Sequence, residues 1–477
     1  MSLKAWALLA AALAAASRAQ ALEPDPSPLC QEARAHLKAL VALDTSNPPG
    51  DEIRAAQYLK KALDADGIES QIFTSTGTRA SLIARVKGDG SKRPLLLMCH
   101  TDVVPADPKE WEYPPFAAVE KDGFLYGRGA ADIKDLCASE AAVLQWLKRS
   151  SATLSRDVIF FAEADEETGD KVRHIDWLLK NHGDALDAEF AINEGGDTVL
   201  EDGRVVEIRV QAAEKEYMDV TAVARGEAGH ASVPRADNAV SALARAVARV
   251  SEHRSPARVS EVVRGFLERQ QETARPPAQG AIADVLAARP GQELDRAADQ
   301  LTTVEPEFGA MLRATVSPTM LKAGYKSNVI PAEAQAVFNA RLLPGQSAAE
   351  LISELRAVID DPTVELRYDP PTRAPVDAMR TNTALYEAVK EAAKELAPTA
   401  RVMPYMTAWT TDSQDLRARG VITYGLIPPF TADDGGRMHG RNERIELASL
   451  DWYTNFLRAI VLKVAAAPAK PGQNPAR

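Results

Sequence analysis

The sequence AEADEETGD at residues 162–170 decides how the rest of the chain is interpreted. It follows DVIFF at residues 157–161, an apolar run rich in β-branched and aromatic residues that predicts a buried strand. The strand ends in four acids, at positions 163, 165, 166 and 167. Carboxylates crowded at the end of a buried strand repel one another and are costly to desolvate unless a cation lies among them. The alternative is an acidic loop on the surface, and this stretch alone does not choose between the two.

Two other predicted strands are also followed by residues of the types that bind metals in proteins. The strand at 94–98 is followed by His100 and Asp102, of which one can ligate a metal while the other orients it. A hydrogen-bonded pair without a metal is the alternative reading of this short motif. The strand at 190–192 is followed by Glu194 and two glycines, which permit close approach of the backbone.

Two further residues complete the set of candidate ligands. Asp132 ends the turn GRGAAD at 127–132, where the alternative is an ordinary helix cap. His439 lies in a polar loop before the last predicted helix. Together the separated segments supply two histidines and several carboxylates, which suits zinc or a similar divalent ion. Two ions about 3.5–4 Å apart need a shared carboxylate plus further ligands for each, and this inventory meets that need.

Composition excludes some classes of function. The chain has 477 residues, of which 45% are hydrophobic, so it has room for two domains with sizeable cores. Its net charge of −11 argues against non-specific binding of nucleic acid, which requires a basic surface. Apart from the N-terminus, no apolar run is long enough to span a bilayer.

The N-terminus predicts export. Lys4 precedes an apolar run at 5–16 and the small-x-small pattern Ala19-Gln20-Ala21, which is typical of a secretory signal peptide over residues 1–21. The alternative is an uncleaved membrane anchor. We therefore expect a periplasmic or secreted protein with no stable membrane insertion after cleavage.

The cysteines predict no disulfide framework. Cys30, Cys99 and Cys137 are odd in number and widely spaced. Cys99 falls in a predicted buried strand and Cys137 on a helix face, where a small apolar thiol is the expected state.

The pattern of elements predicts an α/β protein with an insertion. Strands alternate with helices up to about residue 213, as in a largely parallel sheet that binds ligands beyond its strand ends. Residues 214–374 instead fit a β-α-β-β-α-β unit, an α+β ferredoxin-like domain, interrupted by an extra helical segment at 252–309. The first pattern returns at 375–466. The predicted organisation is thus a signal peptide (1–21), a catalytic domain in two parts (22–213 and 375–466), an inserted domain (214–374) and a disordered tail (467–477).

These motifs, in this order, resemble the M20 metallopeptidases. The family includes glutamate carboxypeptidase, carboxypeptidase S, aminoacylase-1, acetylornithine deacetylase and succinyl-diaminopimelate desuccinylase. The resemblance covers nearly the whole mature chain. It implies a zinc-peptidase-like catalytic domain that carries an inserted dimerisation or lid domain, and hence a homodimer.

The resemblance also implies the metal ligands and the general base. Asp132 would bridge two zinc ions, with His100 and Glu194 completing one site and Glu167 and His439 the other. Cobalt or manganese could replace zinc. Asp102 would hold His100 by its second ring nitrogen.

Glu166 would be the general base that takes a proton from water. A cis peptide is expected after the bridging acid, between Asp132 and Ile133.

Three residues of the insert resemble lid residues of the family. His230 would help to stabilise the oxyanion, usually from the partner subunit. Asn328 would contact substrate, and Arg341 would bind a substrate carboxylate, unless it only pairs with an acid at the sheet edge. One departure lies near the metal ligands, since Asp135 stands where many relatives have glycine and should change the local charge. A loop at 410–413 resembles a segment close to the substrate.

The predicted activity follows from this resemblance. We expect an exported di-zinc metallopeptidase that hydrolyses the amide bond of peptides or N-acyl amino acids with a free C-terminal carboxylate, as a carboxypeptidase does. An N-acyl-L-amino-acid amidohydrolase is the alternative, because both substrates present the same amide and carboxylate. A dipeptidase or aminopeptidase is less favoured, since Arg341 suits a carboxylate better than an amine. A metal-free peptide-binding module is the alternative from another class.

Overall fold

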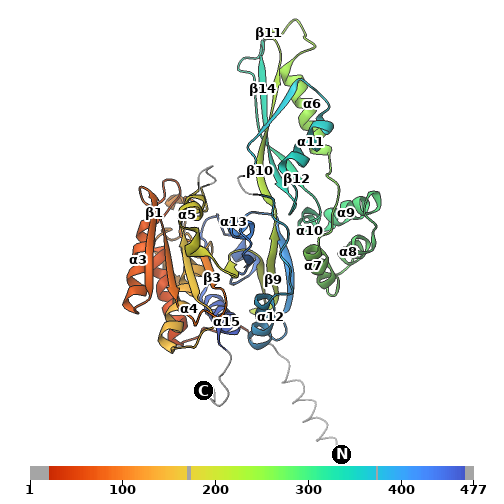
Figure 1. Ribbon diagram of the computed structural model, residues 1–477. Helices are drawn as coiled ribbons and strands as arrows, with labels where there is room; N and C mark the ends of the chain where they lie inside the picture. The colour runs from red at the N-terminus through yellow and green to blue at the C-terminus, as the bar shows by residue number, and fades with distance from the viewer. Residues whose placement is uncertain (1–20, 169–172, 372–373, 468–477) are drawn as a thin grey trace, which may run out of the picture. The chain divides into compact units, whose positions relative to one another are not determined.

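The computed structural model describes residues 21–168, 173–371 and 374–467 (Figure 1). The chain forms two compact units. The first comprises Met1–Val210, Thr381–Met403 and Val421–Arg477, and the second Gln211–Arg380 and Pro404–Gly420. The predicted signal peptide and the predicted tail lie outside the described residues except at their inner ends. No helix in the described ranges is long and apolar enough to cross a membrane.

A ten-stranded mixed sheet forms the centre of the first unit, and two of its strands, β9 and β16, run across the boundary into the second. Its order is β1-β2-β6-β3-β7-β17-β9-β8-β18, with β16 paired to β9. The strands are β1 (Glu69–Thr76), β2 (Arg79–Val86), β3 (Leu95–His100), β6 (Val158–Glu163), β7 (Phe190–Asn193), β8 (Asp197–Glu201), β9 (Arg204–Glu214), β16 (Arg401–Thr407), β17 (Ile422–Gly425) and β18 (Pro429–Phe430).

The sheet is mixed. Strand β3 pairs parallel with β6 and β7, β17 pairs parallel with β7, and β18 pairs parallel with β8, whereas the pairs β1–β2, β2–β6 and β8–β9 are antiparallel. Every residue of β3, β6 and β7 is buried, as the apolar runs predicted. The α/β class is therefore confirmed, but the sheet is mixed: its parallel pairs join the central strands β6, β3, β7 and β17, with one more between β8 and β18.

Helices and a small second sheet complete the first unit. The helices are α2 (Pro28–Val41), α3 (Ile53–Ala65), α4 (Lys134–Ser150), α5 (His174–His182), α12 (Ala384–Leu396), α14 (Ala432–Gly435) and α15 (Leu447–Ala465), with 3-10 turns at Pro108–Glu110 and Gly183–Leu186. The small sheet contains β4 (Val119–Lys121), β5 (Phe124–Tyr126) and β19 (Arg444–Glu446). Helix α4 begins at Lys134, after a cis peptide between Asp132 and Ile133 that matches the expectation from the family resemblance.

The prediction of no disulfide is wrong. Cys99 on β3 and Cys137 on α4 form a disulfide, while Cys30 is a free, buried thiol. Spacing along the chain does not reveal this bond, because the packing of α4 on β3 is what brings the two residues together.

The second unit has the predicted β-α-β-β-α-β order. Its antiparallel sheet, β12-β14-β10-β15, packs against two helices (Figure 1). The elements are β10 (Glu216–Arg225), α6 (Ala239–Glu252), β12 (Thr315–Ala323), β14 (Glu333–Leu342), α11 (Ala348–Ile359) and β15 (Val364–Tyr368). Buried positions of β14 alternate with partly buried ones, and the buried face contributes Phe338, Ala340 and Leu342 to the core.

Additional elements extend the second unit. A two-stranded ribbon, β11 (Gly229–His230) with β13 (Val329–Ile330), lies at one end of the sheet (Figure 1). The predicted extra helical segment forms a cluster of α7 (Glu261–Gln271), α8 (Ala278–Ala287), α9 (Gln292–Val304) and α10 (Pro306–Ala310).

The second unit also takes in Pro404–Gly420, with α13 (Ser413–Ala418), a segment predicted to belong to the catalytic domain. Buried polar contacts explain this difference. Arg417 pairs with Glu214 at 2.6 Å and donates to Gln211 at 3.0 Å.

Candidate metal centre

Five predicted ligands come together in the first unit at the carboxyl ends of its central strands. His100 is the last residue of β3 and pairs in register with Glu163, the last residue of β6. Glu167 follows β6 and Glu194 follows β7, so the parallel arrangement brings these side chains to one edge of the sheet. The list is completed by two loop residues, Asp132 before α4 and His439 after α14.

Asp132 lies between the two imidazoles. Its Oδ1 is 3.5 Å from Nε2 of His100, and its Oδ2 is 2.9 Å from Nε2 of His439. Glu194 Oε1 lies 3.9 Å from Nε2 of His100, and Glu167 Oε1 lies 2.9 Å from Nε2 of His439. Each imidazole thus faces a different oxygen of one shared carboxylate and a second carboxylate of its own.

The donor atoms fit metal ions. One oxygen or nitrogen atom each from His100, Glu166 and Glu194 lie within 4.8 Å of one another, and the same holds for His100, Asp132 and Glu167. Imidazole nitrogen and carboxylate oxygen are suitable ligands for zinc and similar divalent ions. The carboxylate of Glu166 therefore lies among the atoms that could bind a metal ion.

Hydrogen bonding fixes the tautomer of His100. Its Nδ1 lies 3.0 Å from the main-chain oxygen of Asp102, which can only accept, so Nδ1 carries a proton, and in the neutral ring that binds a metal the lone pair is on Nε2. The expectation that Asp102 holds this ring is met through its carbonyl, since its carboxylate is 3.6 Å away.

The carboxylate of Asp102 instead holds the loop after β6. It accepts the main-chain N–H groups of Asp165, Glu166 and Glu167 at 3.1, 3.2 and 3.0 Å. The sequence indicated Asp102 as a partner of His100, but its role in shaping the acidic loop depends on contacts that only the fold reveals.

Electrostatics favour a cation at this centre. Burial opposes protonation of His100, but the hydrogen bond to Asp132 and the charges of Glu194 and Glu166 outweigh it and raise the pKa of His100 well above its usual range. Hydrogen bonds to Asp132 and Glu167 raise the pKa of His439 to about 10. Both shifts arise because negative charge exceeds positive charge, and bound cations would correct the same imbalance.

Glu443 is a supporting residue for which the sequence pattern indicated no role. It is fully buried, and its Oε1 accepts the N–H groups of Ala131 and Asp132 at 2.9 and 3.1 Å. Its other oxygen pairs with Arg128 at 2.5 Å. Glu443 therefore fixes the turn that carries Asp132, and its position four residues after His439 was the one signal for it.

The remaining acids near the centre have other environments. Of the four acids at 163–167, Asp165 pairs with Arg79 at 2.5 Å and Glu163 is fully buried. Asp135 is also fully buried, and burial raises its pKa well above the usual range. A neutral acid is favoured there in the metal-free protein, and the expected change in local charge stays a prediction.

The three predicted lid residues lie in the second unit. His230 pairs with Val329 in the β11–β13 ribbon, next to Asn328, whose carbonyl accepts the N–H of Ala231 at 3.1 Å. Arg341 is the second-last residue of β14, at the end of that strand away from Glu333. From Glu333 to Arg341 that strand spans about 26 Å at about 3.3 Å per residue. One copy of this unit therefore does not bring His230 and Arg341 together.

Arg341 lies in a polar cluster. Its guanidinium is 4.8 Å from the centre of the Tyr217 ring and donates to Asn339 at 3.2 Å and to Thr410 at 3.4 Å. The expected loop at 410–413 therefore does contact this arginine. Burial and the charge of Arg341 lower the pKa of the neighbouring Lys215 to about 7.

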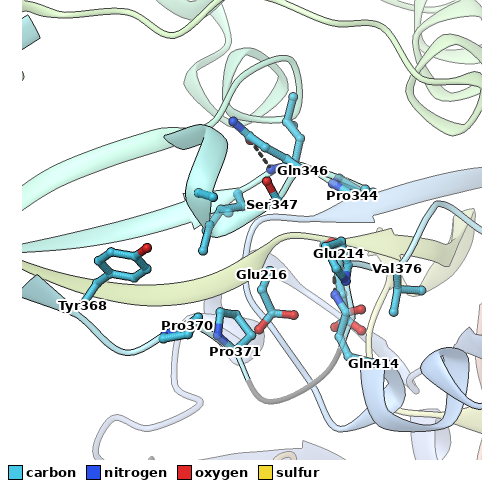
Figure 2. A pocket seen from close by; sticks show the side chains of 16 residues that line it. Glu214, Glu216, Pro344, Gln346, Ser347, Tyr368, Pro370, Pro371, Val376 and Gln414 are labelled. Carbon is cyan, nitrogen blue, oxygen red and sulfur yellow. Dashed lines mark hydrogen bonds between the residues drawn. The ribbon is translucent and has the colours of Figure 1, made fainter. Parts of the chain in front are cut away.

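A cavity of about 240 Å³ lies elsewhere in the second unit. Figure 2 shows Tyr368, Pro370 and Pro371 on its wall, together with Glu214 and Gln414. The carboxylate of Glu214 already binds Arg417 at 2.6 Å and the N–H of Thr411 at 2.7 Å. None of the predicted site residues lines this cavity.

An α/β sheet whose strand ends bring two histidines and several carboxylates around one shared acid defines a metal-dependent hydrolase. The family comparison agrees, since residues 96–463 match the model for Peptidase family M20/M25/M40. The chain belongs to this family and is an M20 metallohydrolase that acts on amide bonds.

Relatives within the family differ in substrate. The chain is 27% identical to human N-fatty-acyl-amino acid synthase/hydrolase PM20D1 over 82% of its length and 76% of that protein. It is 28% identical to succinyl-diaminopimelate desuccinylase from Methylobacterium sp. (strain 4-46), over 94% of its length and 98% of that protein.

Solved structures share the fold. The M20 family metallo-carboxypeptidase Sso-CP2 from Sulfolobus solfataricus matches with a TM-score of 0.66 and 20% identity, over 90% of this chain and 99% of that one. The YXEP protein of Bacillus subtilis, described as a dinuclear metal binding peptidase, matches with a TM-score of 0.57 and 15% identity, over 91% and 99%.

Proposed function

We propose that the protein is an exported di-zinc hydrolase of peptides or N-acyl amino acids that carry a free C-terminal carboxylate. The observation that carries this proposal is the position of Asp132, whose two oxygens face His100 and His439 separately at 3.5 and 2.9 Å. In this assignment His100 and Glu194 hold one zinc ion, Glu167 and His439 hold the other, and Asp132 is shared.

Glu166 is the general base of the proposed reaction. Zinc ions bound here would polarise the amide carbonyl and lower the pKa of water. Glu166 would take a proton from the attacking water and return it to the leaving nitrogen. Asp102 supports this role because it fixes the main chain of Glu166 through the hydrogen bond at 3.2 Å.

His230 suits the role of oxyanion donor. The main-chain N–H of Ser232 points at Nδ1 of His230 at 3.2 Å, so Nδ1 accepts and the proton of a neutral ring lies on Nε2. The side chain is exposed, so Nε2–H is available to a substrate.

Arg341 is the proposed partner of the substrate carboxylate. Tyr217 and Thr410 hold its planar guanidinium, which matches a carboxylate in a two-point arrangement. A free C-terminal carboxylate on the substrate is therefore preferred over an amide. Asn328 is proposed to contact the rest of the substrate.

A homodimer is the proposed assembly. The separation of His230 from Arg341 within one second unit means that a site using both would draw them from two copies. The Cys99–Cys137 disulfide supports export, because such bonds persist in oxidising compartments. A periplasmic or secreted location is thus part of the proposal.

An N-acyl-amino-acid amidohydrolase is the second candidate. It is favoured by the name of the human relative, an N-fatty-acyl-amino acid synthase/hydrolase. Carboxypeptidase and amidohydrolase substrates share the scissile amide and the carboxylate, so one assay can separate them.

Mass spectrometry of a substrate panel tests the proposal. Zinc-loaded protein is incubated with N-blocked dipeptides and with N-acetyl and long-chain N-acyl amino acids, each as the free acid and as the C-terminal amide. We expect hydrolysis of free acids at least about tenfold faster than of the matched amides, the equivalent of one lost charge-assisted contact. Equal rates for acids and amides would contradict the role of Arg341, and no hydrolysis of any substrate would overturn the proposed function.

A further inference from the structure

The loop that carries Glu166 is held in an uncommon backbone conformation. Asp165 has a φ of +81°, in the left-handed region that non-glycine residues seldom adopt. Such a conformation persists only where the surroundings determine it. Asp102 holds the main chain on one side, as described above, and the side chain of Asp165 provides the other attachment.

Three donors from separate segments hold the carboxylate of Asp165. Arg79 on β2 lies 2.5 Å from its Oδ1, and Asn47 donates to the same oxygen at 3.3 Å. The main-chain N–H of His174 donates to Oδ2 at 3.1 Å. The loop before Glu166 is thus attached to β2, to the start of α5 and to the segment between α2 and α3.

Asn47 connects the two carboxylates that hold the loop. Its Nδ2 donates to Asp102 Oδ2 at 2.8 Å as well as to Asp165. The side chain is 2% exposed, and the main-chain N–H of Asn47 is fixed on the carbonyl of Val103 at 2.8 Å. An amide is suited to this position because it donates to two acceptors that would otherwise repel each other.

Arg79 supplies the positive charge of this group. It donates to Asn47 Oδ1 at 2.6 Å, which orients the amide with its NH₂ toward the acids, and to the buried Glu52 at 2.8 Å. One guanidinium therefore binds three acceptors in a fixed geometry, which a lysine ammonium cannot reproduce. Removing it would leave Glu52 and Asp165 buried without a countercharge.

We propose that Asn47 and Arg79 are positioning residues that set the conformation of the Glu166 loop through Asp102 and Asp165. The proposal rests on the proposed function for the role of Glu166, but the contacts themselves can be tested without substrate. Neither residue touches the predicted metal ligands through its side chain in the contacts described. Their effect should thus fall on the rate of the chemical step more than on substrate binding.

Hydrogen–deuterium exchange and kinetics together test the proposal. The variants are Arg79→Met, Arg79→Lys and Asn47→Ala. The matched control is Arg85→Met, which removes an arginine of the same strand that pairs with Asp157 at 2.9 Å. Exchange is measured in the metal-free full-length protein for the amides of residues 165–167. Zinc stoichiometry, kcat and KM are measured in the zinc-loaded protein.

We expect exchange at residues 165–167 to become about tenfold faster or more in Arg79→Met and Asn47→Ala, because local opening becomes easier. The value of kcat should fall roughly 10- to 100-fold while KM stays within about threefold, since a misplaced base affects the transition state. Arg79→Lys should lie between these variants and the wild type. Arg85→Met should match the wild type in every measurement.

Two results would overturn the proposal. One is an exchange rate at residues 165–167 of Asn47→Ala that equals the wild-type rate. This variant removes no charge and is therefore a milder change than Arg79→Met. The other is an equal loss of kcat in Arg85→Met. If the wild-type protein hydrolyses nothing, the proposed function fails, and the exchange data still decide whether these residues position the loop.

Discussion

The contacts around Glu166 fix the position of its main chain and its side chain. Its main-chain N–H bonds to Asp102 at 3.2 Å, and its side chain belongs to a donor set with His100 and Glu194. A side chain so placed can exchange protons with a molecule bound among the ligands. Substituting glutamine for Glu166 removes the group that exchanges protons and changes the shape of the side chain little.

The Glu166→Gln variant should keep its zinc and lose turnover. Glutamine retains an oxygen donor but cannot accept and return a proton at neutral pH, so kcat should fall roughly 10²- to 10⁴-fold. Zinc content by mass spectrometry and kcat on the best substrate check this, with Glu201→Gln as a control at an exposed position of β8. A kcat within threefold of the wild type would remove the general-base assignment.

Metal binding should release protons. In the metal-free protein the pKa of His439 is raised to about 10 and that of His100 is raised well above its usual range, yet both must be neutral to bind a metal. Apparent affinity should therefore rise by about tenfold or more per pH unit between pH 7 and 9. Calorimetry in buffers of different ionisation enthalpy counts the protons, and a His439→Gln variant should release about one fewer. Binding without proton release would contradict these shifts.

Glu140 provides a test of stability away from the ligands. Burial raises its pKa well above the value of 4.5 expected in the unfolded chain. The folded state therefore binds this proton more tightly, and stability falls as pH rises above about 4.5. Glu140→Gln removes that dependence and should be more stable than the wild type by about 1–2 kcal/mol at pH 8. The gap should shrink at pH 5, and a less stable variant at pH 8 would show the acid to be charged.

The residues of the candidate site were easier to predict than the atoms through which they contact one another. The motifs at His100, Asp132, Glu194 and His439 identified side chains that the fold brings together, because each follows a strand or turn with a clear local signal. The contact of His100 with the carbonyl of Asp102, rather than with its carboxylate, depends on three-dimensional geometry that spacing does not encode.

At the scale of elements, a covalent bond joins the strand and the helix beside the metal centre. Cys99 immediately precedes His100 on β3, and Cys137 lies in α4, which follows Asp132. The bond closes a sequence separation of 38 residues. It therefore restricts the unfolded chain and ties together two segments that carry predicted ligands.

Reduction of this disulfide should destabilise the protein. We expect a loss of roughly 2–4 kcal/mol, seen as a lower midpoint of chemical denaturation when a strong reductant is present. A Cys99→Ala/Cys137→Ala double variant should show the lower midpoint with or without reductant, whereas Cys30→Ala should respond to reductant as the wild type does. A wild-type midpoint that is indifferent to reductant would mean that the bond is not formed.

Predicted elements were most accurate where the local pattern was strong. The apolar runs of β3, β6 and β7 were recognisable. The strands β9 and β16 were missed, because Glu207 and Arg209 interrupt the apolar residues of β9 and Pro404 interrupts those of β16. Arg209 pairs with Asp197, and Arg401 pairs with Glu207. These charged side chains of the two strands are therefore neutralised by partners that the local sequence pattern does not reveal.

At the scale of the whole molecule, two copies are proposed to share one reaction. The distance along β14 between the His230 ribbon and Arg341 motivates this assembly. Co-expression of His230→Ala and Glu166→Gln chains tests it, because a mixed dimer then has one site with both native residues. We expect each variant alone to be nearly inactive. In a mixed dimer one of the two sites should be active, so mixed dimers should have up to about half of the wild-type activity. No recovery in isolated mixed dimers would show that His230 acts within its own chain.

The division into units was partly foreseeable. A change from alternating strands and helices to a β-α-β-β-α-β order is visible near residue 214, close to the start of the second unit at Gln211. The return of Pro404–Gly420 to that unit was not, because it depends on the buried pair of Arg417 and Glu214. Whether the second unit acts as a lid stays a prediction.

Anomalous diffraction at the zinc edge, from crystals of the protein grown with zinc, tests the shared role of Asp132 most directly. We predict two peaks per chain about 3.5–4 Å apart, with Asp132 bound to both, and neither peak in Asp132→Ala. A single ion away from Asp132, or full zinc occupancy in Asp132→Ala, would contradict the account.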